Sequence, residues 1–352
     1  MARDVAVVGF AQLPGNRAYE DREEVELVQP VVQELLKGAG ITKDQVDFTV
    51  SGSADYLIGR PFSFVSALDA VAPWPPISES HVEMDGAWAL YEAWVRLLHG
   101  DMDVALVYAY GKSSLGDLRD ILTMQLDPYN VAPLNPDSVS LAALQARMLL
   151  DQGKCTERQM AEVAARDRAS AKDNPNAQLS GDFDPDELLS DPYLVEPLRR
   201  HDCPPITDGA CAVLLAAGDR ARELSDRPAF IRGIDHRVEA HSLGLRELTD
   251  SVSTRIAAKA AGLGDGPVDL AELHAPFSHQ AIILEQALGL GQGVSINPSG
   301  GALSTNAMMV AGLTRIGEAA TRVSRGDANR ALAHATSGPC LQQNLVCILE
   351  AS

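Results

Sequence analysis

The sequence predicts an α/β protein with a mostly parallel sheet that carries helices on its faces. Two observations support this class. Short apolar runs typical of buried strands alternate with segments that have apolar residues at helical spacing. The same order occurs twice, in an N-terminal half over residues 1–220 and a C-terminal half over residues 221–352. The element order therefore predicts two similar βα halves, although no repeat is visible in the sequence itself.

The first half begins with an apolar run over residues 5–10, which predicts a buried strand. Thr42 and Gln45 have the spacing of a capping box, which would open a short helix. Residues from about 113 to 200 break the βα rhythm, and we expect them to form an inserted loop region over the core. Further elements expected in this half are helices over 24–38, 86–100, 141–152 and 157–172, and strands over 104–108 and 211–216.

The second half repeats the plan of the first. Apolar runs predict strands, and amphipathic segments between them predict helices. The expected strands cover residues 229–233, 270–274, 330–335 and 345–350, and the expected helices cover 253–263, 278–288 and about 305–322.

The composition excludes several classes of function. The chain has 352 residues and a net charge of −19, which argues against nucleic-acid and anionic-membrane partners, because both need clustered Lys and Arg. The five cysteines have no metal-binding spacing, and their odd number favours free thiols in a reducing compartment. We find no signal peptide and no apolar run long enough to span a membrane, so we expect a cytoplasmic protein without a bound metal.

Three short motifs in the same order resemble the thiolase superfamily. Ile206-Thr207-Asp208-Gly209-Ala210-Cys211-Ala212 is similar to the Asp-Gly-Ala-Ala segment that ends the first half of that family. Glu272-Leu273-His274-Ala275-Pro276-Phe277 resembles its Glu-x-(His/Asn)-Glu-Ala-Phe loop. Asn297-Pro298-Ser299-Gly300-Gly301 matches its Asn-Pro-x-Gly-Gly turn. The resemblance implies the thiolase fold, a five-layered αβαβα core.

Other segments are similar to a subset of that superfamily, the actinobacterial lipid-transfer-type proteins related to the thiolase domain of sterol carrier protein X. They are His81-Val82-Glu83-Met84-Asp85, Tyr110-Gly111-Lys112-Ser113-Ser114 and Ala333-His334-Ala335-Thr336-Ser337-Gly338-Pro339. The resemblance implies sterol side-chain CoA thioesters as substrates, and in some relatives retro-aldol cleavage. It also implies a homodimer or a heterodimer with a second thiolase-like chain, and a small OB-fold zinc-ribbon partner.

The nucleophilic cysteine of a thiolase is missing. Its position holds Glu83 in an alignment without a gap, or Gly86 after a shift of three residues, and no cysteine lies near either. This excludes an acyl-cysteine intermediate at that place. Glu83 or Asp85 could instead act as a base toward a substrate hydroxyl. The alternative is that either carboxylate only caps the following helix.

The other two catalytic positions of the family are also altered. The second histidine is replaced by Ala307, and the final cysteine by Gly338, with Cys340 nearby. We expect Ser337 and Gly338 to close the floor of the substrate pocket if the arrangement of the family holds. Cys347 lies in an apolar strand and is expected in the core.

His274 is the remaining candidate. In the family this loop places a group that orients an oxyanion, so His274 could stabilise an enolate or move a proton, or it could only satisfy the loop backbone. Asn297, Gly300 and Gly301 could line the CoA-thioester site through their backbone N–H groups, or serve the turn alone. Lesser candidates are His334, Asp208, Lys112 (which could also be a surface charge) and His279, which we expect to be structural.

The missing cysteines favour retro-aldol cleavage of a sterol side-chain β-hydroxyacyl-CoA, a reaction that needs a base and an oxyanion site but no nucleophile. The second half contains no tyrosine, although retro-aldol relatives use tyrosines there, and this counts against an enzyme that works alone. The alternative is a non-catalytic acyl-CoA- or lipid-binding subunit of a thiolase-like hetero-oligomer. An acyltransferase of the thiolase type is expected least.

Overall fold

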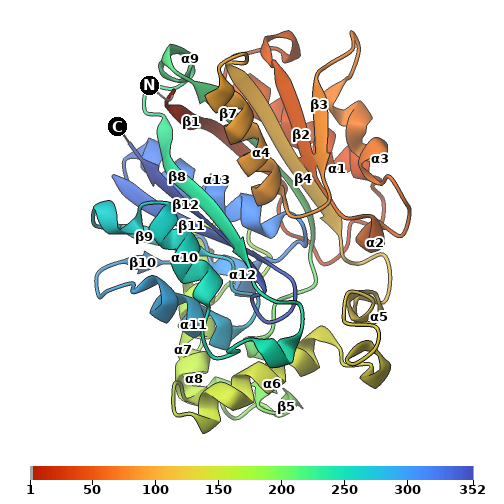
Figure 1. Ribbon diagram of the computed structural model, residues 1–352, viewed down its shortest axis with the longest axis vertical. Helices are drawn as coiled ribbons and strands as arrows, with labels where there is room; N and C mark the ends of the chain where they lie inside the picture. The colour runs from red at the N-terminus through yellow and green to blue at the C-terminus, as the bar shows by residue number, and fades with distance from the viewer. Residues whose placement is uncertain (1–2, 352) are drawn as a thin grey trace.

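The computed structural model describes residues 3–351, and its centre is one sheet of ten strands in the order β10-β9-β11-β12-β8-β1-β7-β4-β2-β3 (Figure 1). A separate pair, β5 (Tyr193–Val195) and β6 (Leu198–Arg199), lies outside it. The strands of the large sheet are β1 (Val5–Gln12), β2 (Phe48–Gly52), β3 (Glu79–Val82), β4 (Val104–Lys112), β7 (Asp208–Ala217), β8 (Ala229–Val238), β9 (Leu270–Leu273), β10 (Ser295–Ile296), β11 (Arg330–Ser337) and β12 (Gln343–Glu350).

Thirteen α-helices occur among the described residues. They are α1 (Glu24–Gly38), α2 (Asp55–Ile58), α3 (Phe64–Leu68), α4 (Gly86–His99), α5 (Leu118–Thr123), α6 (Ser138–Asp151), α7 (Glu157–Ser170), α8 (Pro185–Leu188), α9 (Asp219–Leu224), α10 (Val252–Ala260), α11 (Ser278–Leu288), α12 (Gly301–Ser304) and α13 (Ala311–Arg325). No helix in this part of the chain is both long and apolar enough to cross a bilayer.

The two halves of the sheet have the same strand order. Numbered within its own half, each reads third, second, fourth, fifth, first, from β3 to β1 and from β10 to β8. The halves meet where β1 pairs with β8 through Ala6–Phe230 and Val7–Ala229. The prediction of two similar βα halves is therefore confirmed at the level of topology.

The prediction of a mostly parallel sheet is wrong at the fifth strand of each half. β7 and β12 run antiparallel to both of their neighbours, so the sheet contains four parallel and five antiparallel pairings. β12 follows β11 after a short turn over residues 338–342, and a connection of that length joins only antiparallel strands. An apolar run predicts a buried strand but carries no information about its direction.

The core has five layers. α1 packs on β1, β4 and β7, and α10 packs on β8 and β12. α4 and α13 lie between the two halves of the sheet and contact both each other and the strands. Alternation along β4 shows the layering: Leu106 and Tyr108 belong to the cluster beside α1, whereas Val107 belongs to the cluster around α4 and α13.

The chain between β4 and β7 contributes no strand to the large sheet. It forms α5 to α8 and the β5–β6 pair, which lie at the bottom of the molecule in Figure 1. α7 packs against α11 and α12, so this segment covers the second half of the core. It also supplies one wall of the main cavity described below.

Candidate functional site

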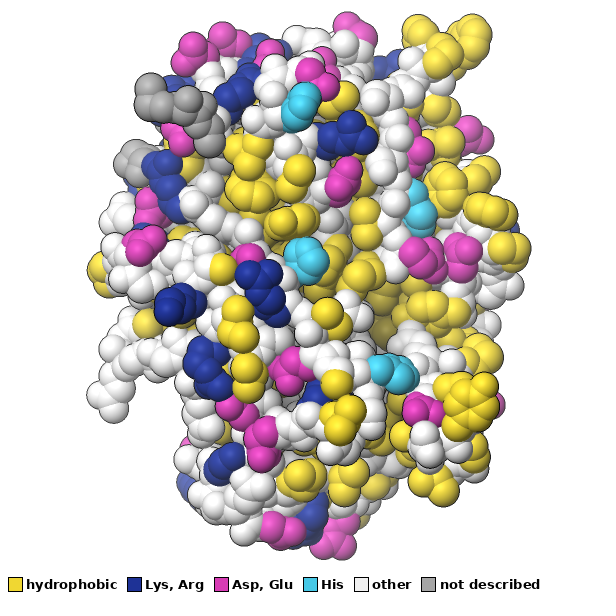
Figure 2. All heavy atoms as spheres, in the orientation of Figure 1, with side chains coloured by type: hydrophobic (Ala, Val, Ile, Leu, Met, Phe, Trp, Pro, Cys, Tyr) yellow, Lys and Arg dark blue, Asp and Glu magenta, His cyan; other side chains and the backbone are white. Residues whose placement is uncertain are grey.

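The main cavity has a volume of about 810 Å³ and lies where the two halves meet the segment that holds α5 to α8. Binding sites for small organic ligands are typically about 300–1,000 Å³. Figure 2 shows this face hollowed beside the position of α2 and above α5, with hydrophobic side chains around the hollow. The apolar wall comes mainly from the segment between β4 and β7, with Leu118, Leu122, Leu126, Val139, Leu141 and Leu194.

The charged groups around the cavity are nearly all positive. Four arginines line it, Arg17, Arg119, Arg168 and Arg200, against one carboxylate, Asp85. Arg119 pairs with Asp137 at 3.2 Å. The other three arginines have no carboxylate within 4.0 Å among residues 3–351. In a chain of net charge −19, this local excess of cations suits an anionic ligand.

His274 lines the cavity at the end of β9. Its ring is held on both sides: Nδ1 accepts the backbone N–H of Thr336 at 3.3 Å, and Nε2 lies 3.1 Å from Oδ1 of Asn306. Burial, followed by the nearby His334 and Arg315, lowers the pKa of His274 to about 3. The ring is therefore neutral near neutral pH, and neither nitrogen is free to take a proton.

The two candidate carboxylates of the first half lie in different surroundings. Asp85 is buried, lines the cavity and accepts backbone N–H groups from Ala87, Gly312 and Leu313 at 2.8–3.0 Å. It therefore caps α4 and also binds the first turn of α13. Burial raises the pKa of Asp85 above the ordinary range of a carboxyl. Glu83 is half-exposed outside the cavity, where it accepts the N–H of Asp55 and contacts His81.

Asn297, Gly300 and Gly301 do not line the main cavity. The side chain of Asn297 accepts the N–H of Leu273 at 2.7 Å and donates to Asp167 at 2.9 Å, which ties the end of β9 to α7. Gly301 has φ +60°, and a Cβ there would lie 2.5 Å from Nδ2 of Asn297. In this structure the turn supports the loop that carries the site.

Ser337, the last residue of β11, lines the cavity together with Gly338 and Cys340 of the turn between β11 and β12. Gly338 has φ +75°, a backbone conformation that favours glycine, and a Cβ there would approach Oε1 of Gln342 to 2.6 Å. Arg246 donates to the carbonyls of Pro339 and Cys340 and holds the turn in place.

None of the cavity cysteines resembles a nucleophile. Cys203 and Cys340 line the cavity, but burial raises their pKa to about 12 and about 11. A thiol with such a pKa is protonated near neutral pH, and the thiolate is the nucleophilic form. Cys347 lies fully buried in β12, as its apolar surroundings predict.

The lesser candidates serve the structure. Asp208 accepts from Ser114 and from the N–H of Tyr19, and His279 is buried against Gln145. The surface reading of Lys112 is wrong: the residue is 5 % exposed and its ammonium donates to the carbonyl of Arg22. A lysine at the end of a strand can be buried when a carbonyl accepts a hydrogen bond from its ammonium. The sequence does not show that such an acceptor lies nearby.

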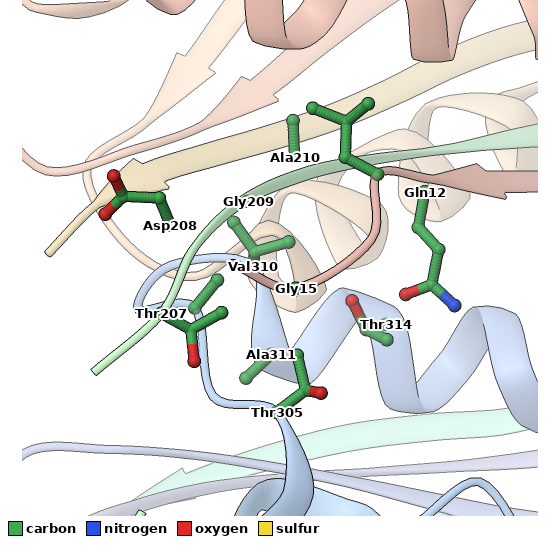
Figure 3. Close-up of a pocket in the computed structure, with 12 residues that line it drawn as sticks. Gln12, Gly15, Thr207, Asp208, Gly209, Ala210, Thr305, Val310, Ala311 and Thr314 are labelled. Atoms are coloured by element: carbon green, nitrogen blue, oxygen red, sulfur yellow. The ribbon is translucent and has the colours of Figure 1, made fainter. Parts of the chain in front are cut away.

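Ala307, which replaces the second histidine of the family, does not line the main cavity. It lines a second cavity of about 20 Å³, close to the size of one water molecule. Figure 3 shows Gln12, Thr207, Thr305 and Thr314 around that space. The neighbouring Asn306 lines the main cavity instead.

Sequence reasoning missed three parts of the site: Asn306, the arginines and Tyr56. Tyr56 lies in α2 and lines the cavity, and burial raises its pKa to about 12, so its hydroxyl stays protonated and can donate. It comes from the first half, so the absence of tyrosine from the second half did not exclude a phenol here. Tyr56 lies in a helix of only four residues, and so short a helix has no sequence pattern that would have identified it.

Comparisons with known proteins agree with this fold. No family model matches the chain. An acetyl-CoA acetyltransferase of Methanothermobacter thermautotrophicus is 28% identical over 93% of this chain and 92% of its own length. A 17-hydroxy-3-oxo-4-pregnene-20-carboxyl-CoA lyase of Mycobacterium tuberculosis is 27% identical over 66% of this chain and 62% of its own length.

A solved structure of an Ltp2–ChsH2(DUF35) aldolase superposes with a TM-score of 0.81 at 20% identity, covering 99% of this chain and 98% of that one. A human mitochondrial 3-ketoacyl-CoA thiolase superposes with a TM-score of 0.78 at 16% identity, covering 99% of each chain. At these identities the likeness shows the fold alone, and that fold is the thiolase fold. The chain is thus similar in sequence to CoA-dependent enzymes of the thiolase superfamily, and similar in fold to the structural neighbours.

Proposed function

We propose that this protein binds a CoA thioester and cleaves a C–C bond in it by a retro-aldol reaction, with a sterol side-chain β-hydroxyacyl-CoA as substrate. The observation that carries the proposal is one large cavity with an apolar wall, an excess of arginines and hydrogen-bond donors, but no thiolate. Among the similar proteins, one lyase is named for a steroid CoA thioester and one structure is an aldolase.

The reaction follows from a base and an oxyanion site. The base removes the proton of the β-hydroxyl, the Cα–Cβ bond breaks, and the electrons of that bond form the enolate of a shorter acyl-CoA. The β-carbon becomes the carbonyl of a ketone, and a proton added at Cα completes the shorter acyl-CoA. No covalent bond to the protein forms at any step, so the missing cysteine is no obstacle.

Asp85 is our candidate for the base, because it is the one carboxylate among the described residues that line the cavity. Burial raises its pKa, which moves a carboxyl toward the range useful for taking a proton. The donors beside His274 would stabilise the enolate oxygen. The arginines, three of them without an acidic partner among residues 3–351, suit the phosphate groups of CoA.

The test is direct. The purified protein, alone and with a small OB-fold zinc-ribbon partner, would be incubated with a β-hydroxyacyl-CoA that carries a steroid. We expect equal amounts of a steroid ketone and a shorter acyl-CoA, detected by liquid chromatography and mass spectrometry. If neither the ketone nor the shorter acyl-CoA forms in either preparation, the proposal is overturned. Thiolysis of acetoacetyl-CoA is measured in parallel, and we expect none, because the cavity thiols are protonated.

A second function is favoured by one observation: the polar groups of the site are already engaged. His274 uses both ring nitrogens, and Asp85 accepts three backbone N–H groups. A non-catalytic acyl-CoA-binding subunit of a hetero-oligomer would have such a site. It would bind the thioester without turnover and would copurify with a second thiolase-like chain. A cytoplasmic homodimer that is active by itself would exclude this alternative.

A further inference from the structure

We propose that the amide of Asn306 is the donor that contacts the thioester oxygen, and that His274 acts behind it as a positioning residue. This inference rests on the proposed function, because it names the atom that would meet the carbonyl of a bound CoA thioester. Both residues line the main cavity, and Nε2 of His274 lies 3.1 Å from Oδ1 of Asn306.

The hydrogen bonds determine which way each group points. The backbone N–H of Thr336 can only donate, so Nδ1 of His274 must be the acceptor in their 3.3 Å contact. A neutral imidazole with Nδ1 as acceptor carries its proton on Nε2. Nε2–H therefore donates to Asn306, and the atom of Asn306 that faces it must be the carbonyl oxygen.

This leaves the NH₂ group of Asn306 as the exposed end of the pair. Nδ2 has no hydrogen-bond partner among residues 3–351, and it is absent from the fully buried polar atoms that lack one. Because Asn306 is a cavity residue, its unpaired N–H bonds face the space in which a ligand would lie. The hydrogen bond from His274 to Oδ1 also polarises the amide and strengthens it as a donor.

A backbone hydrogen bond also holds Asn306 in place. Its N–H donates to Oγ1 of Thr207 at 3.2 Å, and Thr207 in turn donates to Gln178 at 2.7 Å. The next residue, Ala307, turns toward the small cavity and forms a bridge with Thr207. The loop thus directs Asn306 toward the main cavity, while the side chain of Ala307 lines the small cavity instead.

The pair is a donor that does not switch with pH. The pKa of His274 is lowered to about 3, chiefly by burial, so the ring stays neutral through the range in which enzymes are assayed. A proton carrier needs a pKa near the assayed range, so if His274 carried the proton its titration would appear in the pH profile of activity. If it orients Asn306, the profile keeps its shape when His274 is replaced, and only the rate falls.

The test uses a steroid acyl-CoA labelled with ¹³C at the thioester carbonyl and measures the frequency of that carbonyl in the bound state by infrared spectroscopy. We expect the frequency to rise in Asn306→Ala, because a donor has been lost. His274→Leu should raise it less, and His274→Gln, whose amide can replace the Nε2–H donor, should restore most of the wild-type value. Asn130→Ala, an exposed asparagine outside the cavity, is the matched control.

Turnover of the β-hydroxyacyl-CoA gives the second readout. We expect Asn306→Ala to lower kcat by roughly 10²–10³ with little change in KM, as for the loss of one oxyanion donor. The double variant with His274→Leu should be no slower than Asn306→Ala alone, because His274 acts through Asn306. Circular dichroism of each variant checks that the fold is retained.

The outcomes separate the two proposals. A wild-type protein that binds no CoA thioester overturns the proposed function and this inference with it. Binding with an unchanged carbonyl frequency in Asn306→Ala overturns only the role of Asn306. If the fold-decrease in kcat of the double variant equals the product of the two single fold-decreases, His274 contacts the substrate itself, and this overturns the positioning role.

Discussion

Asp85 connects two helices that lie far apart in the sequence. It caps α4 through the N–H of Ala87, and it also accepts the N–H groups of Gly312 and Leu313 in α13, which follow it in the sequence by 227 and 228 positions. Asp85→Ala should lower the free energy of unfolding by about 2–4 kcal/mol, because the cap is lost and buried N–H groups are left without an acceptor. Urea denaturation followed by circular dichroism measures the change.

Asp184→Ala is the matched control, since Asp184 caps only the short surface helix α8. It should cost no more than about 1 kcal/mol. Equal losses in the two variants would contradict the double role of Asp85.

At the scale of the residue, the sequence could indicate which side chains have chemical roles, but not which groups they hydrogen-bond in the folded chain. A helix cap near 85 and a special role for His274 were expected from their local patterns. The second helix bound by Asp85 could not be expected, because nothing local identifies it. Asn306 was missed for the same reason: its meaning depends on His274, which lies 32 residues earlier and bonds to it only in the folded chain.

At the scale of the element, the loop between α12 and α13 rests directly on β4. A Cβ added at Gly111 would lie 2.0 Å from the carbonyl oxygen of Met308, and a backbone atom cannot move aside alone. Gly111→Ala should therefore lower the free energy of unfolding by at least about 2 kcal/mol through overpacking. It should also displace the loop whose residues Met308 and Met309 line the cavity, so acyl-CoA affinity is expected to fall in the same variant.

Gly38→Ala tests whether this cost is due to the contact. Gly38 is the last residue of α1, and a Cβ there would meet nothing within 4 Å. Alanine should leave stability unchanged or raise it by a few tenths of a kcal/mol, because it favours the helix. Thermal unfolding and titration with acyl-CoA compare both variants, and a Gly111→Ala protein as stable as wild type would contradict the packing of this loop.

Element bounds were most predictable where the local signals agree. α1 and α11 begin and end where helical spacing and glycine place them, at 24–38 and 278–288. α13 begins at Ala311, six residues later than expected, because residues 305–310 pass over β4 and form the site. β2 was missed although Phe48, Thr49, Val50 and Ser51 alternate between apolar and polar as a strand does, because the run is only five residues long. β3 was missed because three of its four residues are polar.

At the scale of the whole molecule, the repetition of βα units was enough to predict two similar halves. The sequence does not contain the direction of β7 and β12, which depends on how the chain returns to the sheet. The cavity also belongs to this scale, because its walls come from both halves and from the segment between β4 and β7. Only the resemblance to a family, and not the local pattern, suggested that such a site exists.

Three fully buried histidines make the stability of the whole fold sensitive to acid. Burial is the largest cause that lowers the pKa of His274 and His279 to about 3 and that of His334 to about 4. In the unfolded chain a histidine titrates near 6.5. Between these values the unfolded state binds more protons than the folded state, so the contribution of each ring is fully present above about pH 6.5 and is lost as the pH falls.

His279 allows this effect to be measured outside the cavity. It lies in α11 against Gln145, and it does not line the site. Relative to His279→Gln, the wild-type protein should lose about 1.4 kcal/mol of unfolding free energy per pH unit from about pH 6 down to about pH 4. Urea denaturation at a series of pH values gives this difference, with His99→Gln as the control that removes an exposed histidine. A difference between wild type and His279→Gln that stays constant with pH would show that His279 titrates in the folded protein as it does in the unfolded chain, and that burial does not hold its ring neutral.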